Sequence, residues 1–122
     1  MKLKLGQLID ARGALRAIGA ERLPVKLAYR IQRNMRKIDI ELREVDEANL
    51  KLIRELGEKQ PDGNWHVKPE NLDAFRDAMK ALRDEDIEID IRAVSIDELP
   101  VDVAPLTLMD LDFMFEAGKE DA

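Results

Sequence analysis

One long stretch with heptad spacing constrains the fold of this chain more than any other feature. Pro24 suits the first position of a helix, where its missing N–H costs nothing, and Gly57 is a natural stop. Between them, apolar side chains recur in alternating steps of three and four, the pattern of a packed helix pair or coiled coil. We therefore predict an unbroken helix over residues 24–56, about 50 Å long. Its seam comprises Ala28, Ile31, Met35, Ile38, Leu42, Val45, Asn49, Leu52 and Leu56.

This helix is too long to be covered by a simple globule. A compact chain of this size has a radius of gyration of about 14 Å. Either two shorter helices of the same chain cover the two halves of the seam, or a second copy covers part of it. Asn49 interrupts the seam. It either fixes the register or oligomeric state of a coiled coil, or it lies near the helix end and is solvated.

Two further helices of ordinary length and one short helix are expected. Apolar residues at helical spacing predict helices over residues 6–19 and 69–83. Thr107 resembles the start of a short last helix. The apolar face of this helix either caps the chain's own core or contacts a neighbouring subunit. It consists of Leu108, Leu111, Met114 and Phe115.

Short strands complete a mostly helical α+β fold. Alternating apolar and polar residues predict a small sheet or hairpin from about residues 64–68 and 87–94, with a change of phase at Ala93–Val94. The first residues, 2–5, also alternate and allow a brief strand. Residues 57–64 are expected to form a loop, because they contain the turn signal Asp62-Gly63.

Composition indicates one domain. The chain has 122 residues, of which 45% are hydrophobic and 38% charged, and no cysteine. This length suits a single core over residues 1–117, followed by a loose acidic tail at 118–122. Disulfides and thiolate chemistry are excluded. No apolar run approaches the roughly 20 residues of a membrane span, and the start lacks a signal core, so neither a membrane contact nor secretion by that route is expected.

The charge is unevenly distributed. Residues 1–83 hold 18 basic and 13 acidic residues, whereas residues 84–122 hold 2 basic and 13 acidic residues. The acidic end is expected to contact the basic part of its own chain, that of a neighbour, or a basic partner. Nucleic-acid binding is not expected, because an acidic protein repels phosphates and no aromatics interleave with the basic stretch. The candidate acidic surface consists of Glu88, Asp90, Asp97 and Glu98.

Residues with catalytic chemistry are few. His66, Ser95 and Thr107 are the only residues of their kinds, so a nucleophile pair would need Ser95 to meet His66 without further support. A single imidazole does not make a zinc site. The carboxylates of residues 84–90 lack the order of a calcium-binding loop. We therefore expect no catalytic residue, no metal site and no cofactor.

Six segments spread over most of the chain are considered together: residues 1–8 (MKLKLGQL), 23–31 (LPVKLAYRI), 50–57 (LKLIRELG), 69–72 (PENL) with Phe75, 87–91 (IEIDI) and 107–114 (TLMDLDFM). In the same order, these segments resemble those of a family of small uncharacterised tailed-bacteriophage proteins.

The resemblance implies a viral, non-enzymatic protein, and the family has no established activity or catalytic residues. Combined with the long seam, it predicts a self-associating virion structural or assembly component that works through protein-protein contacts. The alternative is a phage accessory protein that binds and inhibits a host factor through its acidic C-terminal region. Its partners would be further copies, other phage proteins or a host protein, in the virion or the host cytoplasm.

Overall fold

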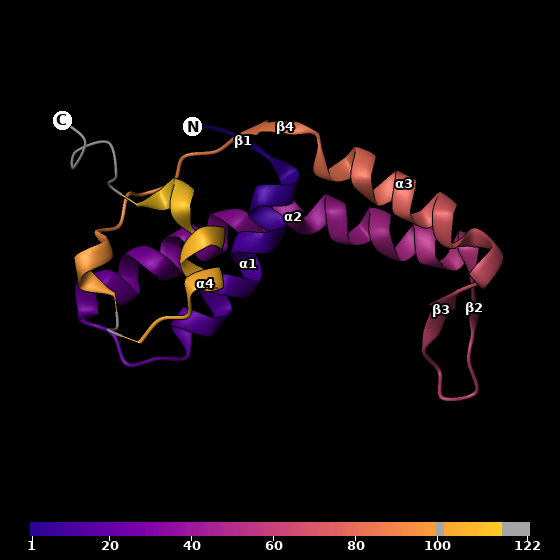
Figure 1. Cartoon of the computed structure of the whole chain (residues 1–122), viewed down its shortest axis with the longest axis horizontal. Coiled ribbons are helices and arrows are strands. Elements are labelled where there is room, and N and C mark those ends of the chain that lie inside the picture. Colours follow the sequence, from indigo (N-terminus) through magenta and orange to yellow (C-terminus); the bar gives the residue numbers. More distant parts are fainter. Residues whose placement is uncertain (100–101, 116–122) are drawn as a thin grey trace.

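The long helix α2 (Val25–Leu56) runs unbroken through the molecule (Figure 1). A computed structural model describes residues 1–99 and 102–115. The long helix predicted between Pro24 and Gly57 is confirmed, and Gly57 is its C-cap residue. Pro24 was predicted at the first helical position but is the N-cap residue, so the helix begins at Val25. Its 32 residues span about 48 Å. The predicted tail at 118–122 lies outside the described residues.

Two other helices of the same chain cover α2. Helix α1 (Leu5–Gly19) packs on its first half, and α3 (Leu72–Arg83) runs beside its second half (Figure 1). A turn of 3-10 helix, η1 (Pro69–Asn71), leads into α3. Of the two arrangements allowed by the sequence, the one within a single chain is therefore present. The fold is the predicted mostly helical α+β class.

The strands form two separate antiparallel pairs rather than one sheet. Strand β1 (Lys2–Lys4) pairs with β4 (Asp86–Glu88), and β2 (Gly57–Lys59) pairs with β3 (Trp65–Val67). The segments expected near 64–68 and 87–94 thus have different partners. The prediction of a loop throughout 57–64 was wrong for β2. The residues of β2 show no alternation of apolar and polar side chains. They are extended because the chain continues directly from α2 into the hairpin with β3.

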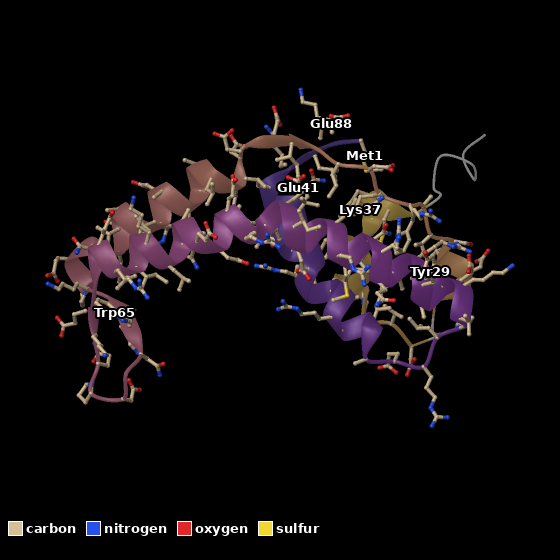
Figure 2. All side chains as sticks on the ribbon, turned by 180° about the vertical axis from the view of Figure 1, so that it is seen from behind. Met1, Tyr29, Lys37, Glu41, Trp65 and Glu88 are labelled. Carbon is tan, nitrogen blue, oxygen red and sulfur yellow. The ribbon has the colours of Figure 1, made fainter. Side chains whose placement is uncertain are left out.

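The hairpin β2–β3 is fixed closely to the end of α2. Gly57 begins it, and a Cβ atom at this position would clash with the carbonyl oxygen of His66 and lie 2.6 Å from that of Ile53. Gly63 adopts the left-handed conformation in the turn, with φ of 89°. The hairpin therefore projects from the far end of the α2–α3 pair, and Trp65 lies on it (Figure 2).

The prediction of a strand over residues 87–94 was wrong beyond Glu88, where β4 ends, but the segment after β4 remains buried. Ile89, Ile91 and Val94 all belong to the core, and Val94 forms a parallel bridge with Phe115. Ile89 and Ile91 are two residues apart, but the next buried residue, Val94, follows after three. This shift is the change of phase predicted at Ala93–Val94. This segment closes the core formed by α1 and the first half of α2.

The C-terminal helix α4 (Pro105–Asp110) begins two residues before the predicted start. Pro105 occupies its first position and Ala104 is the N-cap, so Thr107 does not cap it. A proline at the first helical position needs no hydrogen-bond partner and fixes the start. A 3-10 turn, η3 (Asp112–Met114), follows. Leu111 and Met114 are buried in the chain's own core, and Leu108 and Phe115 are half-buried.

The two ends of α2 are packed differently. Buried side chains lie along residues 25–45, about the first two thirds of the helix, whereas α3 buries no residue completely. We call residues 46–56 of α2, the hairpin and α3 the arm. The arm extends away from the core (Figure 1), and its apolar side chains remain partly accessible.

Candidate binding surface

The predicted seam of α2 is used within the chain. Ile31, Ile38, Leu42 and Val45 are buried in the core, and Met35, Asn49, Leu52 and Leu56 are half-buried. Ala28 is exposed, and Leu27 is buried in its place. The seam prediction was therefore wrong in register at its start.

The reason is the period of the buried stripe. The residues buried on α2 are Leu27, Ile31, Asn34, Ile38, Leu42 and Val45. They repeat at about 3.6 residues per turn, the period of a straight α-helix, whereas a supercoiled seam repeats at about 3.5. Residues 27–45 of α2 thus form one wall of a globular core.

Asn34 is the polar residue in this stripe, and the sequence did not single it out. It is 0% exposed. Its Nδ2 donates to the carbonyl oxygen of Arg92 at 2.9 Å, and its Oδ1 accepts from the backbone N–H of Arg92 at 3.0 Å. The side chain thus pairs with the extended segment as a neighbouring strand would. The sequence signal that could have identified Asn34 as buried is its position in an otherwise apolar stripe, one residue before Met35.

The acidic segment contacts the basic half of α2 in its own chain. Arg30 lies 3.1 Å from Glu98, and Lys37 Nζ lies 3.4 Å from the carboxylate of Asp90 and 2.8 Å from its carbonyl oxygen. Of the three arrangements predicted from the charge asymmetry, the contact within the chain is present. These two carboxylates are therefore already paired.

The other two residues of the candidate acidic surface differ from each other. The carboxylate of Glu88 lies 3.4 Å from the terminal amino group of Met1 (Figure 2). Asp97 is exposed and makes no ion pair among the described residues. The four residues therefore do not form a continuous free acidic surface.

One ion pair joins α1 to α2 and makes stability depend on pH. Arg12 donates two hydrogen bonds to Asp46, at 2.8 and 2.9 Å. These bonds lower the pKa of Asp46 and raise that of Arg12. Because the folded-state pKa of Asp46 is lowered, its contribution is present above the unfolded pKa of about 4 and is lost as pH falls through the folded pKa.

We expect Asp46→Asn to lower the free energy of unfolding at pH 7 by about 0.5–1 kcal/mol, since the pair is half-exposed and screened. Urea unfolding at pH 7 and pH 3 checks this. The loss should shrink at pH 3, where the wild-type carboxylate is partly protonated. Glu47→Gln, an exposed neighbour, is the control. An equal loss at both pH values would contradict the assignment.

A groove opens between the start of α1 and one face of α3. Its volume is about 990 Å³. The apolar side chains of Leu72, Phe75 and Met79 line it, with Arg76 and Lys80 also in its wall. We call it the α3 groove. Leu72 is 45% exposed, so the groove presents apolar surface to solvent.

Ion pairs fix the inner wall of the α3 groove. Arg83 donates two hydrogen bonds to Asp10 on α1, at 2.9 and 3.2 Å, which raise the pKa of Arg83. Lys4 lies 2.8 Å from Asp86, and this contact lowers the pKa of Asp86 and raises that of Lys4. The groove wall is therefore held by contacts between α1, α3 and the β1–β4 pair.

A second apolar surface lies on α4. Leu106 is 73% exposed and Met109 is 70% exposed, and the spacing of three residues puts both on one face of the helix. Acidic Asp102, Asp110 and Asp112 lie nearby in the chain, and no basic residue occurs between Arg92 and Lys119. We call Leu106 and Met109 the α4 patch. The sequence prediction had placed the contact face of this helix on its buried side.

The α3 groove and the α4 patch flank the same part of α1. Gln7 and Asp10 line the α3 groove, and both also line a smaller hollow together with Met109 and Asp110. We call Gln7 and Asp10 the α1 ridge. Figure 1 shows α1 between α4 on one side and the arm on the other. The α3 groove and Met109 of the α4 patch therefore border one ridge.

The two residues of the possible nucleophile pair, Ser95 and His66, do not meet. Ser95 precedes η2 (Ile96–Glu98), drawn in orange in Figure 1, and His66 lies on β3 at the opposite end of the molecule. Within residues 1–99 and 102–115, no cluster of carboxylates or imidazoles is arranged to hold a metal ion. In the same residues, no helix combines the length and the apolar character that a membrane span requires.

Comparison with protein-family models, curated proteins and solved structures found no match for this chain. The resemblance to tailed-phage proteins stays a prediction.

Proposed function

We propose that this chain is a non-enzymatic protein that works through protein-protein contacts and associates with itself. The observation that carries the proposal is the α3 groove, with the exposed α4 patch on the other side of the α1 ridge. Both surfaces leave large apolar side chains in water although the chain has a well-packed core.

Two physical arguments support a binding role. Contiguous exposed apolar surface with a polar border is typical of protein interfaces. The arm also holds apolar residues that α3 covers only partly, and the amide oxygen of Asn49 within it is buried without a hydrogen-bond partner among the described residues. An imperfectly packed arm gains stability when a partner removes its apolar surface from water.

The setting proposed for this function is a bacteriophage, as a structural or assembly component of the virion. It rests on the resemblance of the sequence alone. Detection of the protein in purified particles would distinguish a virion component from an assembly helper. The alternative is a host-directed inhibitor that binds through its acidic C-terminal region. Of its four candidate carboxylates, Glu88, Asp90 and Glu98 each lie near a positive group of the chain, whereas Asp97 makes no ion pair among the described residues.

Sedimentation velocity from low micromolar to submillimolar concentration tests self-association. We expect the wild-type sedimentation coefficient to rise with concentration. Leu72→Glu places a charge in the α3 groove and should shift this rise to at least about tenfold higher concentration, because an unpaired charge is costly to bury.

Leu50→Glu is the matched control. Leu50 is 57% exposed on the arm and does not line the α3 groove. The Leu50→Glu variant should sediment as the wild type does. A wild-type protein that stays monomeric over the whole range would refute self-association, and circular dichroism verifies that each variant is folded.

A further inference from the structure

We infer that the outer side of the first part of α2 binds an acidic helix of another protein. This side lies opposite the stripe that α2 buries in the core, and it combines basic with apolar side chains. We call it the α2 outer face. It consists of Val25, Lys26, Tyr29, Arg33, Arg36 and Ile40.

The apolar side chains of the α2 outer face are accessible to solvent. Val25 is 85% exposed, Tyr29 52% and Ile40 57%. Steps of three and four residues put them on the same side of the helix as Arg33. The guanidinium of Arg33 lies over the ring of Tyr29, 5.8 Å from its centroid, and this contact favours the arrangement of the two side chains. The face therefore offers apolar contact and positive charge together.

Two basic residues of the α2 outer face are not neutralised by the chain. Lys26 and Arg33 make no ion pair among the described residues, and no acidic residue occupies the helix positions three or four away from either of them. Arg36 also makes no ion pair in this part of the chain, but Asp39 follows it by three residues. The charge of the face therefore rests on Lys26 and Arg33, and a carboxylate is the group that complements it.

The chain's own acidic segment already binds to the neighbouring row of basic residues on α2. Glu98 lies 3.1 Å from Arg30, and the carboxylate of Asp90 lies 3.4 Å from Lys37. The first part of α2 thus binds carboxylates through basic residues two helical turns apart.

The α2 outer face repeats this spacing. Lys26 and Arg33 are seven residues apart, as are Arg30 and Lys37, so each row places two charges about 10 Å apart along the helix. The rows are adjacent, because Arg30 follows Lys26 by four residues. A second acidic segment can therefore lie along the first row in the way that the chain's own segment lies along the second.

The apolar residues of the face select a protein helix as the occupant. Val25 and Ile40 gain from contact with aliphatic groups, which a phosphate backbone lacks. The net charge of -6 also repels a polyanion at longer range. A helix places carboxylates seven residues apart on one side, at the spacing of Lys26 and Arg33. An acidic helix with aliphatic side chains therefore matches this face in both charge and apolar contact.

Two synthetic peptides of about 20 residues, long enough to be helical, test the inference. The first carries leucines and glutamates on one side, with the glutamates seven residues apart, and the second has glutamine in place of each glutamate. In isothermal titration calorimetry with the whole chain, the glutamate peptide should bind and the glutamine peptide should bind at least about tenfold more weakly. Added salt should weaken the binding of the glutamate peptide, because the charges are exposed.

A charge reversal locates the binding on α2. Lys26→Glu should weaken the binding of the glutamate peptide at least about tenfold, because it places like charges opposite each other. Lys51→Glu is the matched control. Lys51 is an exposed lysine of the same helix outside the α2 outer face, with Glu47 and Glu55 four residues to either side. This variant should bind the peptide as the wild type does, and circular dichroism verifies that both variants are folded.

The outcomes separate this inference from the proposed self-association. No binding of the glutamate peptide, or an equal loss in Lys26→Glu and Lys51→Glu, overturns the inference. Tighter binding of oligothymidylate or of phosphatidylglycerol vesicles than of the glutamate peptide also overturns it, because the face would then belong to a nucleic acid or a membrane. A strictly monomeric protein that binds the glutamate peptide refutes self-association and leaves this inference in place.

Discussion

Replacement of Asn34 by alanine is expected to lower the free energy of unfolding by about 2–4 kcal/mol. The Asn34 side chain is 0% exposed and makes two hydrogen bonds to the backbone of Arg92. Alanine removes both partners at once and leaves the N–H and C=O of Arg92 partly buried and unpaired. The loss therefore includes the cost of two unsatisfied backbone groups, as well as that of the cavity.

Urea denaturation followed by circular dichroism measures this loss. It should be done at low micromolar concentration, so that association does not add to the stability. Gln32→Ala is the matched control, because Gln32 is an exposed amide on the same helix. Its change should stay within about 0.5 kcal/mol. If Asn34→Ala and Gln32→Ala cost the same, the pairing with Arg92 does not hold the extended segment.

Leu42→Ala should have the second large effect, a loss of about 2–5 kcal/mol. Leu42 is 0% exposed and belongs to the hydrophobic core cluster. Truncation removes buried methyl groups and leaves a cavity that the rigid surroundings cannot fill.

Two further leucines of α2 serve as comparisons for Leu42. Leu50→Ala removes the same atoms from a side chain that is 57% exposed, so its loss should stay below about 1 kcal/mol. Leu52→Ala, in the half-buried arm, should fall between the two. Equal losses of free energy of unfolding at Leu42 and Leu52 would show that the core part of α2, up to Val45, and the arm are packed alike, contrary to the structure.

The extent of α2 was predictable because its signals are local. Pro24 and Gly57 mark the two ends through their own backbone properties, and the apolar stripe between them is helical in any context. The register of the buried face was harder to predict. A heptad and a straight helical stripe differ by only about 0.1 residue per turn, so Leu27 takes the place of Ala28 at the start of the pattern.

Strand partners and polar contacts were not predictable in the same way. Alternation in residues 87–91 predicts an extended segment, but nothing in it points to β1 as the partner, which lies more than 80 residues earlier. In the sequence, Asn34 is an ordinary polar residue, and only the structure shows that it lies beside Arg92. Such pairings depend on tertiary structure, and a short segment gives weak information about them.

The candidate surface was predicted only in part. The sequence indicated that an acidic end would meet basic residues, and the structure resolves this as Glu98 with Arg30 and Asp90 with Lys37. It also indicated that α4 has an apolar face. Leu106 and Met109, which point away from that face, became candidates only when their exposure was known. Exposure of an apolar side chain is a property of the whole fold.

Amide hydrogen exchange at two protein concentrations distinguishes the packed part of α2 from the surfaces that we propose to bind a second copy. Residues 31–45 of α2 are packed within the chain, whereas the α3 groove and the α4 patch are proposed to associate. At low concentration, amides of residues 31–45 should exchange slowly and those of α3 faster. At high concentration, protection should rise in α3, in α4 and around Gln7 and Asp10, with residues 31–45 unchanged. Protection that rises along residues 31–45, or nowhere in the described residues, would refute self-association through the α3 groove and the α4 patch.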